Sequence, residues 1–137
     1  MTRTSTSTFR VRYGETDQMG VAYHAHYLVW CEIGRTDWIR GLGITYAELE
    51  RQGHILAVAE ASVRYRASAR YDDLVRVDTR LDSVKSRALT FAYEIAREEP
   101  GPARLATAST TLVSLDRAGA PTRLPDSVLN RFREATS

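Results

Sequence analysis

An acidic side chain just ahead of a predicted helix is the feature of this sequence with the clearest chemical potential. Asp17 lies in the polar turn between Gly14 and Gly20, and a helical pattern begins near His24. A carboxylate in this place can act on a carbonyl group as a general base or as a nucleophile. The unpaired N–H groups at a helix start can stabilise the oxyanion that forms. Aspartate is also an ordinary turn former, so the spacing alone leaves a structural role for Asp17 open.

Other reactive residue types in the same stretch indicate chemistry less clearly. Glu15 is a second acid in the turn, and we expect it to be solvated or to pair with a nearby arginine. His24 and His26 are two positions apart, so on a helix they face different directions and make a poor metal pair. Cys31 falls on the apolar side of the helix, where a thiol is usually an inert small hydrophobe. The sequence therefore predicts no metal site, and from the spacing alone a structural role for Asp17 is the more common one.

A long helix must position this chemistry. Its apolar residues recur at i, i+3, i+4, i+7 and i+11, which is one continuous stripe of a helix. The stripe consists of Tyr27, Trp30, Cys31, Gly34 and Trp38. The helix begins near His24 and is expected to end at Gly41 or Gly43, since glycine suits a left-handed C-cap.

The polar side of this helix carries charges at spacings that suit surface ion pairs. Glu32, Arg35 and Asp37 are expected to form an ion-pair set with Arg40. Residues three or four positions apart are neighbours on a helix surface, so these charges can meet without help from another element. We assign the set a structural role.

The rest of the chain is dominated by strand patterns. Alternation of apolar and polar residues predicts strands at about 9–13, 57–65, 75–81, 89–95 and 104–115. One strand has a small-residue face made of Ala57, Ala59, Ala61, Val63 and Tyr65. A capping box at Thr45–Glu48 predicts a short second helix, and Pro125 begins a terminal helix that ends near Ala135. The predicted fold class is α+β, with one long helix on one face of a five-stranded antiparallel sheet.

Length and composition describe an ordinary globular domain. The chain has 137 residues, of which 43% are hydrophobic and 26% charged. We expect one domain over 9–137, preceded by a flexible Thr/Ser-rich tail at 1–8. A net charge of +2 without a basic cluster argues against nucleic-acid binding, and no apolar run approaches the ~20 residues of a membrane span. The single cysteine fits a reducing compartment, so we predict a cytoplasmic protein, and free sheet edges predict a homo-oligomer.

The stretch from Tyr13 to Arg40 also carries a family resemblance. Together with RYDDLVRVDTRL, FAYEI and the closing TRLP, it resembles the hotdog-fold acyl-CoA thioesterases, closest to the YbgC-like and 4-hydroxybenzoyl-CoA thioesterase branches. The resemblance covers about residues 9–126, and its most specific part is a T-D-x-x-G-x-x-x-H-x-x-Y spacing. That spacing is formed by Thr16, Asp17, Gly20, His24 and Tyr27. The resemblance implies a hotdog fold, in which a five-stranded antiparallel sheet wraps around one long central helix.

The resemblance also implies an activity, which is hydrolysis of an acyl- or aryl-CoA thioester to the free acid and coenzyme A without any other cofactor. The family's catalytic carboxylate, described as nucleophile or general base, falls on Asp17, and its carbonyl-polarising backbone N–H falls on His24. The imidazole of His24 and the phenol of Tyr13 match side chains that assist in the YbgC-like branch, although Tyr13 suits the core equally well. Two alternatives stay open: a hotdog hydratase or dehydratase acting on acyl thioesters, and a non-catalytic acyl-CoA-binding protein.

Substrate binding is implied by the same resemblance. Related enzymes use basic residues near the hairpin that holds Lys85 and Arg87 here to bind the coenzyme A phosphates, and Arg64, Arg66 and Arg70 are second candidates. An acyl carrier protein could take the place of coenzyme A. In this family the acyl pocket lies between two subunits of a dimer, or of a tetramer built from such dimers. The implied pocket residues are Gly20, Tyr27, Val58, Ala59, Glu60 and Ala61.

Overall fold

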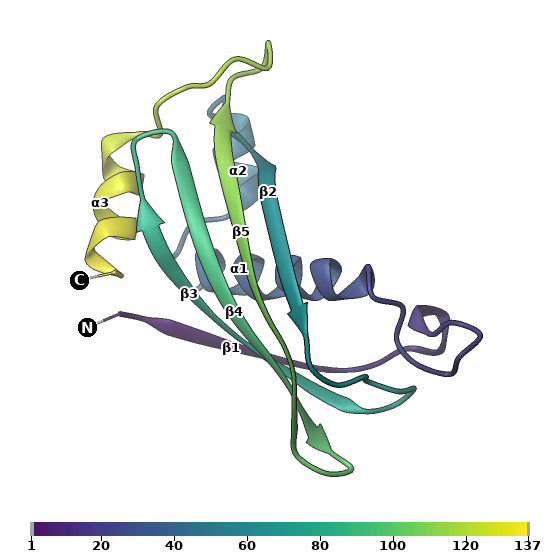
Figure 1. Ribbon diagram of the computed structural model, residues 1–137. Coiled ribbons are helices and arrows are strands. Elements are labelled where there is room, and N and C mark those ends of the chain that lie inside the picture. The colour runs from purple at the N-terminus through teal and green to yellow at the C-terminus, as the bar shows by residue number, and fades with distance from the viewer. Residues whose placement is uncertain (1, 137) are drawn as a thin grey trace.

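One antiparallel sheet of five strands is the framework of the molecule in a computed structural model that describes residues 2–136 (Figure 1). The strands are β1 (Thr4–Arg10), β2 (Ile55–Tyr65), β3 (Leu74–Val84), β4 (Ala88–Glu99) and β5 (Ala103–Leu115). They lie in the order β1-β3-β4-β5-β2, and every neighbouring pair is antiparallel. The predicted α+β class and the five-stranded antiparallel sheet are therefore confirmed.

Three α-helices accompany the sheet within the described residues. They are α1 (His26–Arg40), α2 (Tyr46–Arg51) and α3 (Asp126–Glu134), and a short 3-10 helix, η1 (Tyr13–Glu15), precedes α1. The two short α-helices lie where the sequence predicts them. None of the helices in this part of the chain is long and apolar enough to cross a membrane.

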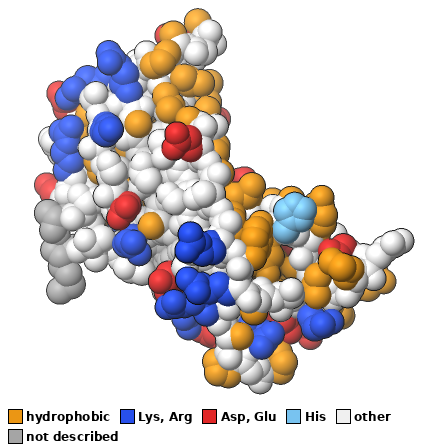
Figure 2. Space-filling model, viewed as in Figure 1, with side chains coloured by type: hydrophobic (Ala, Val, Ile, Leu, Met, Phe, Trp, Pro, Cys, Tyr) orange, Lys and Arg blue, Asp and Glu red, His pale blue; other side chains and the backbone are white. Residues whose placement is uncertain are grey.

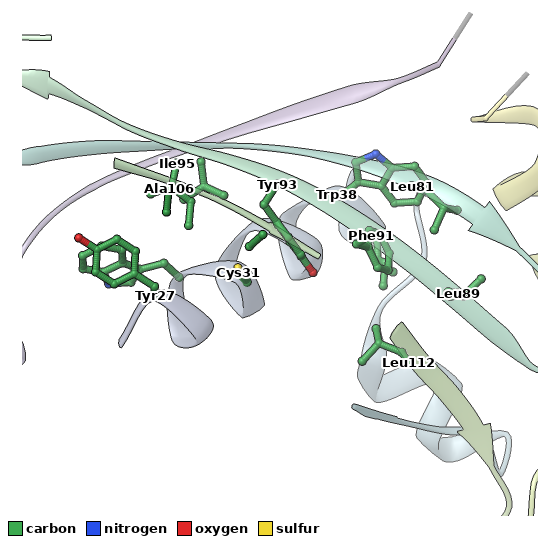
Figure 3. Packing of buried hydrophobic residues seen from close by; sticks show 14 of the residues in the cluster. Tyr27, Cys31, Trp38, Leu81, Leu89, Phe91, Tyr93, Ile95, Ala106 and Leu112 are labelled. Carbon is green, nitrogen blue, oxygen red and sulfur yellow. The ribbon is translucent and has the colours of Figure 1, made fainter. Parts of the chain in front are cut away.

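The longest of these helices, α1, packs on the sheet through the predicted stripe. All five stripe residues are buried, and Figure 3 shows Tyr27, Cys31 and Trp38 among side chains of β4 and β5. The Trp38 ring meets the Phe91 ring edge-on at 5.5 Å between centroids. A Cβ on Gly34 would lie 2.3 Å from Thr79 Oγ1, so only glycine lets α1 approach β3 this closely. The stripe thus fixes the position of the helix, and with it the place where the helix begins.

Both ends of α1 differ slightly from the prediction. The helix begins at His26, because His24 and Ala25 form a turn ahead of it. It ends at Arg40 and is followed by Gly41 in a right-handed conformation, whereas Gly43 has a φ of +82°. The left-handed glycine of the two is therefore Gly43.

The N-terminal segment is a strand, and the predicted flexible tail at residues 1–8 is wrong for residues 4–8. β1 begins at Thr4 and pairs with β3 as far as Arg10. Threonine is β-branched and suits a strand, and the Ser7 hydroxyl finds a partner on α1: its Oγ donates to Asp37 Oδ2 at 2.7 Å. Residue 1 of the predicted tail lies outside the described residues, as does residue 137 of the predicted domain.

A β-bulge at Ala59 divides β2. Val58 pairs with Leu112 and Glu60 pairs with Thr111, which leaves Ala59 without a partner residue. An extra residue exchanges the two faces of a strand, because side chains alternate with a period of two. The face toward α1 therefore consists of Leu56, Val58, Ala61, Val63 and Tyr65. The predicted small-residue face is correct after the bulge and wrong before it.

The outer side of β2 is an open edge of the sheet, and most of its side chains are exposed. The neighbouring surface of α1 is also apolar and exposed: Leu28, Val29 and Ile33 keep 40%, 43% and 37% of their surface accessible. On β2 itself Val58 is 50% exposed. An unpaired strand edge beside an apolar helix surface is a surface that soluble proteins usually cover.

Candidate active site

The turn that holds Asp17 is tightly fixed by backbone hydrogen bonds. The Asp17 N–H donates to the Val21 carbonyl at 2.9 Å, and the Gly20 N–H donates to the Asp17 carbonyl at 3.0 Å. Gly20 has a φ of +79°, a left-handed conformation that glycine adopts without strain. The Met19 N–H donates to Asp17 Oδ1 at 2.9 Å, which is the expected Asx geometry. The other carboxylate oxygen has no hydrogen-bond partner among the described residues, so Asp17 is a turn former that keeps one oxygen available.

The segment between this turn and α1 presents an unused backbone donor. The His24 carbonyl accepts hydrogen bonds from the Tyr27 N–H at 3.2 Å and from the Tyr65 hydroxyl at 2.8 Å. The His24 N–H, by contrast, has no acceptor within residues 2–136. Tyr65 thus holds the helix start against the end of β2 while the His24 N–H stays free, as an oxyanion donor must be.

Asp17 and His24 line one cavity of about 310 Å³. Its walls come from the Asp17 turn, the start of α1 and the chain that follows β2. The lining residues are Asp17, Met19, Val21, Ala22, His24, Tyr27, Tyr65, Arg66, Ala67 and Ser68. Figure 2 shows hydrophobic side chains gathered over the part of the molecule where α1 begins in Figure 1. A free carboxylate oxygen and a free N–H therefore border one partly apolar space that can hold a small ligand.

Sequence reasoning missed Tyr65 as a site residue. Its hydroxyl fixes the His24 carbonyl, and its ring meets the Tyr27 ring edge-on at 5.1 Å between centroids. One feature of the sequence could have identified Tyr65: it is the one aromatic residue of the small-residue face, and it stands at the end of that face, on the side directed toward the helix.

The implied pocket residues do not lie together. Tyr27 lines the Asp17 cavity, and Gly20 belongs to the turn beside it. Val58 and Ala61 line a second cavity of about 280 Å³ between α1 and β2. Glu60 lies in a third hollow of similar size, with Ser109 and Thr111 of β5. Ala59 occupies the bulge and is exposed. Within one chain, these residues do not form a single pocket.

The predicted phosphate-binding residues also separate into two groups. Arg66 lines the Asp17 cavity, and Arg70 Nη1 would lie 3.7 Å from a Cβ placed on Gly20. Arg64 precedes Tyr65 on β2 and so faces the opposite side of the strand. None of these three arginines forms an ion pair within the described residues. Arg66 and Arg70 are thus free cations beside the cavity.

Lys85 and Arg87 lie far from that cavity. They belong to the β3–β4 turn, where the Ser114 N–H donates to the Arg87 carbonyl. Ser114 pairs with Leu56 near the start of β2, whereas Tyr65 at its end pairs with Ala106. At about 3.3 Å per strand residue, the two places are roughly 25 Å apart along β5, and Figure 1 shows them at opposite ends of the sheet. One chain cannot bring the first-choice cations to Asp17.

Tyr13 lies in η1 rather than on the predicted strand, and it is not in the core. It is 77% exposed and meets the Tyr71 ring edge-on at 5.7 Å between centroids. It does not line the cavity that holds Asp17. The strand ends at Arg10, three residues earlier than predicted, and this places the Tyr13 side chain on the surface.

Glu15 is buried, and the prediction of a solvated acid is wrong, although the expected pairing with an arginine is present. Its carboxylate accepts hydrogen bonds from Trp30 Nε1 at 2.9 Å and from the Arg12 N–H at 2.8 Å, and it lies 3.5 Å from Arg12 Nε. Burial raises the pKa of Glu15, but the bonds from Arg12 and Trp30 outweigh it and leave the pKa below its ordinary value. Both oxygens are engaged, so Glu15 ties the turn to α1.

The predicted ion-pair set on α1 is confirmed only in part. Arg40 Nη1 lies 2.9 Å from Asp37 Oδ1, as expected. Arg35 is instead buried and forms no ion pair with Glu32 or with any other described residue. Within residues 2–136, no cluster of three His, Cys, Asp or Glu side chains is placed to hold a metal ion.

Cys31 should resist thiol reagents in the folded protein. Burial raises its pKa to about 12, although the nearby Arg35 charge lowers it, so thiolate is scarce at neutral pH. A disulfide reagent such as dithionitrobenzoate should label native protein at least about 10²-fold more slowly than protein unfolded in urea. Equally fast labelling of the two forms would contradict the burial of this thiol.

Comparison with known proteins identifies the family. Residues 11–132 match the family model of the thioesterase-like superfamily. The chain belongs to the thioesterase-like superfamily. The predicted resemblance to hotdog thioesterases is therefore confirmed.

Relatives within the thioesterase-like superfamily extend over most of the chain. The acyl-CoA thioester hydrolase YbgC of Escherichia coli is 31% identical over 126 residues, which are 91% of this chain and 92% of YbgC. YneP of Bacillus subtilis is 37% identical over 91 residues, 66% of each protein, so the match spans slightly less than two thirds of YneP. The crystal structure of a DHNA-CoA thioesterase from Staphylococcus aureus has a TM-score of 0.86 at 35% identity and covers 96% of this chain and 87% of that one.

Proposed function

We propose that this protein is a thioester hydrolase that converts an acyl- or aryl-CoA to the free acid and coenzyme A. The observation that carries the proposal is the shared cavity of Asp17 and His24, in which one carboxylate oxygen and one backbone N–H have no hydrogen-bond partner among residues 2–136. The names of the relatives, an acyl-CoA thioester hydrolase and a DHNA-CoA thioesterase, support the same reaction.

In the proposed reaction, the thioester carbonyl lies between the two groups. As a general base, Asp17 takes a proton from water, and the water oxygen bonds to the carbonyl carbon. The His24 N–H stabilises the resulting oxyanion, a contribution typically worth about 10²–10³ in rate. The tetrahedral intermediate then breaks its carbon–sulfur bond, and the thiolate of coenzyme A receives the proton from Asp17. Tyr13 lies outside the cavity, so we assign it no step.

Asp17 can also act as the nucleophile. Its free oxygen would then bond to the carbonyl carbon and displace the thiolate, which gives a mixed anhydride that water hydrolyses. A single turnover in heavy-oxygen water tests for the anhydride route. Label in the Asp17 carboxylate identifies an anhydride that water attacks at the Asp17 carbonyl. Label in the released acid alone is expected from the general base, and also from an anhydride that water attacks at the substrate carbonyl.

We further propose that a second subunit completes the substrate site. Arg66 and Arg70 lie beside the Asp17 cavity, form no ion pair within the described part of the chain and are suited to the phosphates of coenzyme A. Lys85 and Arg87 can serve the same cavity only from another subunit, because they lie at the far end of their own sheet. The cavity between α1 and β2, with Val58 and Ala61, is the proposed acyl pocket once the open β2 edge is covered. The assembly would be a dimer or a tetramer of such dimers, and sedimentation of the full chain tests it.

A thiol-release screen over aryl, short, medium and long acyl-CoAs tests the function. We expect release of coenzyme A from at least one class with saturation kinetics. The same incubations followed by absorbance of an enoyl-CoA separate the alternatives, since hydration bleaches the conjugated band without releasing thiol. Saturable binding without thiol release across the panel would instead identify a binding protein. The acyl-phosphopantetheine form of an acyl carrier protein, included in the panel, tests whether it replaces coenzyme A.

A further inference from the structure

The start of α1 has no side-chain cap of its own. Ala25 occupies the N-cap position, where its methyl side chain accepts no hydrogen bond, and the first turn of the helix contains no acidic residue. The start of α2 is different, because the Thr45 hydroxyl there accepts the Glu48 N–H at 3.1 Å. An uncapped start leaves backbone N–H groups open to a ligand, but it also lacks the bond that usually keeps a first turn from fraying. The start of α1 therefore depends on another element for its position.

The Tyr65 hydroxyl supplies this hold from the end of β2. It donates to the His24 carbonyl at 2.8 Å, and the only other donor to this carbonyl within residues 2–136 is the Tyr27 N–H, at 3.2 Å. The Tyr27 N–H belongs to the helix that is to be held. The Tyr65 bond is thus the one hydrogen bond that ties the His24 backbone to another element of the described chain.

Tyr65 is itself firmly placed on the sheet. It pairs with Ala106 of β5, and the Arg66 N–H directly after it donates to the Leu105 carbonyl at 2.8 Å. Its ring meets the Tyr27 ring edge-on at 5.1 Å between centroids. Burial is the main cause that raises the pKa of Tyr65 above its ordinary value, so the hydroxyl keeps its proton at neutral pH and remains a donor. The hold therefore reaches from the sheet to the helix start.

The single proton of the Tyr65 hydroxyl is already in use. Tyr65 lines the Asp17 cavity, but a phenol donates only one hydrogen bond, and the His24 carbonyl accepts it. Tyr65 therefore cannot donate to a substrate oxyanion while this bond persists. What the bond does fix is the orientation of His24, because the carbonyl and the N–H of one residue belong to two rigid peptide planes that meet at its Cα. Rotation of one plane displaces the other.

We propose that Tyr65 is a positioning residue for thioester hydrolysis, whose hydroxyl holds the His24 carbonyl and so keeps the His24 N–H directed into the cavity. The proposal rests on the proposed function and adds to it a residue that contacts no reacting atom. A displacement of about 1 Å can cost about 10² in rate, and an oxyanion donor acts on the transition state rather than on bound substrate. Loss of the Tyr65 hydroxyl should therefore slow the chemical step without weakening substrate binding.

Steady-state thiol release by Tyr65→Phe tests the proposal, because phenylalanine keeps the ring and removes only the hydroxyl. The kcat should fall by about 10–10²-fold while KM stays within about twofold, since a lost transition-state interaction lowers kcat and kcat/KM equally. The matched control is Tyr71→Phe, whose hydroxyl has no hydrogen bond among residues 2–136 and lies outside the cavity lining. It should leave both constants within about twofold. An unchanged kcat in Tyr65→Phe overturns the proposal, and so does a raised KM alone, which would make Tyr65 a substrate-binding residue.

Amide hydrogen exchange measures the hold without any substrate. In Tyr65→Phe the Tyr27 and Leu28 N–H groups of the first turn should exchange at least about fivefold faster, whereas the Leu49 N–H of the capped helix α2 should not change. A lower kcat with unchanged exchange overturns the proposal, because Tyr65 would then act on the substrate directly. If the unaltered protein releases no thiol from any acyl thioester, the proposed function fails, and the exchange comparison alone decides whether Tyr65 holds the His24 backbone.

Discussion

Replacing Asp17 by asparagine should lower the rate of thiol release by about 10²–10⁴-fold without disturbing the fold. Asparagine keeps an oxygen that can accept the Met19 N–H, so the Asx turn survives. The amide can neither take a proton from water nor attack a carbonyl carbon, so both proposed routes are blocked. The measurement is continuous thiol release from the acyl-CoA that performs best in the substrate screen, together with thermal unfolding and sedimentation of the variant.

The chain contains a matched control for this substitution. Asp116 lies in a turn of the same geometry: its Oδ1 accepts the Ala118 N–H at 2.9 Å, and its carbonyl accepts the Gly119 N–H at 3.0 Å. This turn follows the end of β5, far along the sheet from the cavity. Asp116→Asn should keep the activity within about twofold of the unaltered protein. Near-normal turnover in Asp17→Asn would remove Asp17 from the reaction, and an equal loss in both variants would indicate damage to the turns instead.

The elements of this molecule could be predicted because local periodicity determines them. The α1 stripe from Tyr27 to Trp38 is buried as its spacing requires, and each alternating segment overlaps a strand, although the first strand ends at Arg10. The errors arise where two patterns look alike. Alanines at 57, 59 and 61 give β2 similar faces in either register, so the bulge at Ala59 leaves no trace in the sequence. Serine and threonine at 4–8 suit a loose tail and a strand equally, and pairing with β3 decides the outcome.

The site could be predicted only where its residues are close in sequence. Asp17 and His24 meet because one turn and one helix start carry them. The environment of a charge depends instead on distant partners. Glu15 is buried because Trp30 supplies a donor from the next helix, and Arg35 is buried because the strand residue Tyr93 lies under α1. The spacing of the charges on α1 predicted that Arg35 takes part in a surface ion-pair set with Glu32. In the structure the two side chains form no ion pair. The separation of Arg87 from Asp17 follows from strand pairing, which places them near opposite ends of β5 and which local patterns do not contain.

Glu15→Gln should destabilise the fold by about 2–3 kcal/mol in the free energy of unfolding at neutral pH. Both carboxylate oxygens accept N–H donors, from Trp30 Nε1 and from the Arg12 backbone. A glutamine presents one oxygen and one NH₂ group, so one donor would face another donor in a buried place. The matched control is Glu48→Gln on α2, whose partner Arg51 is largely exposed. Surface pairs contribute about 0–1 kcal/mol, so this control should stay near the unaltered protein in urea unfolding.

The same difference should depend on pH in a defined direction. The pKa of Glu15 lies below its ordinary value of 4.5, so the folded state favours the charged form more than the unfolded state does. The stabilisation from ionised Glu15 is complete above 4.5 and is lost as the pH falls through the lower, folded-state pKa. Urea unfolding of the unaltered protein and of Glu15→Gln should therefore converge in acid and diverge toward neutral pH. A constant difference across this range would show that the carboxylate charge plays no part.

The contact between Glu15 and Trp30 can be isolated with a double-mutant cycle. Trp30→Phe removes the indole donor and leaves an aromatic ring in the core, so Glu15→Gln should be less harmful in that background. We expect a coupling of about 1 kcal/mol or more, because the two groups form a buried, charge-assisted hydrogen bond. The segment that leads from η1 into the Asp17 turn is tied to α1 through this bond. A substantial coupling would therefore mean that the same contact stabilises the fold and holds the proposed catalytic carboxylate near the start of the helix.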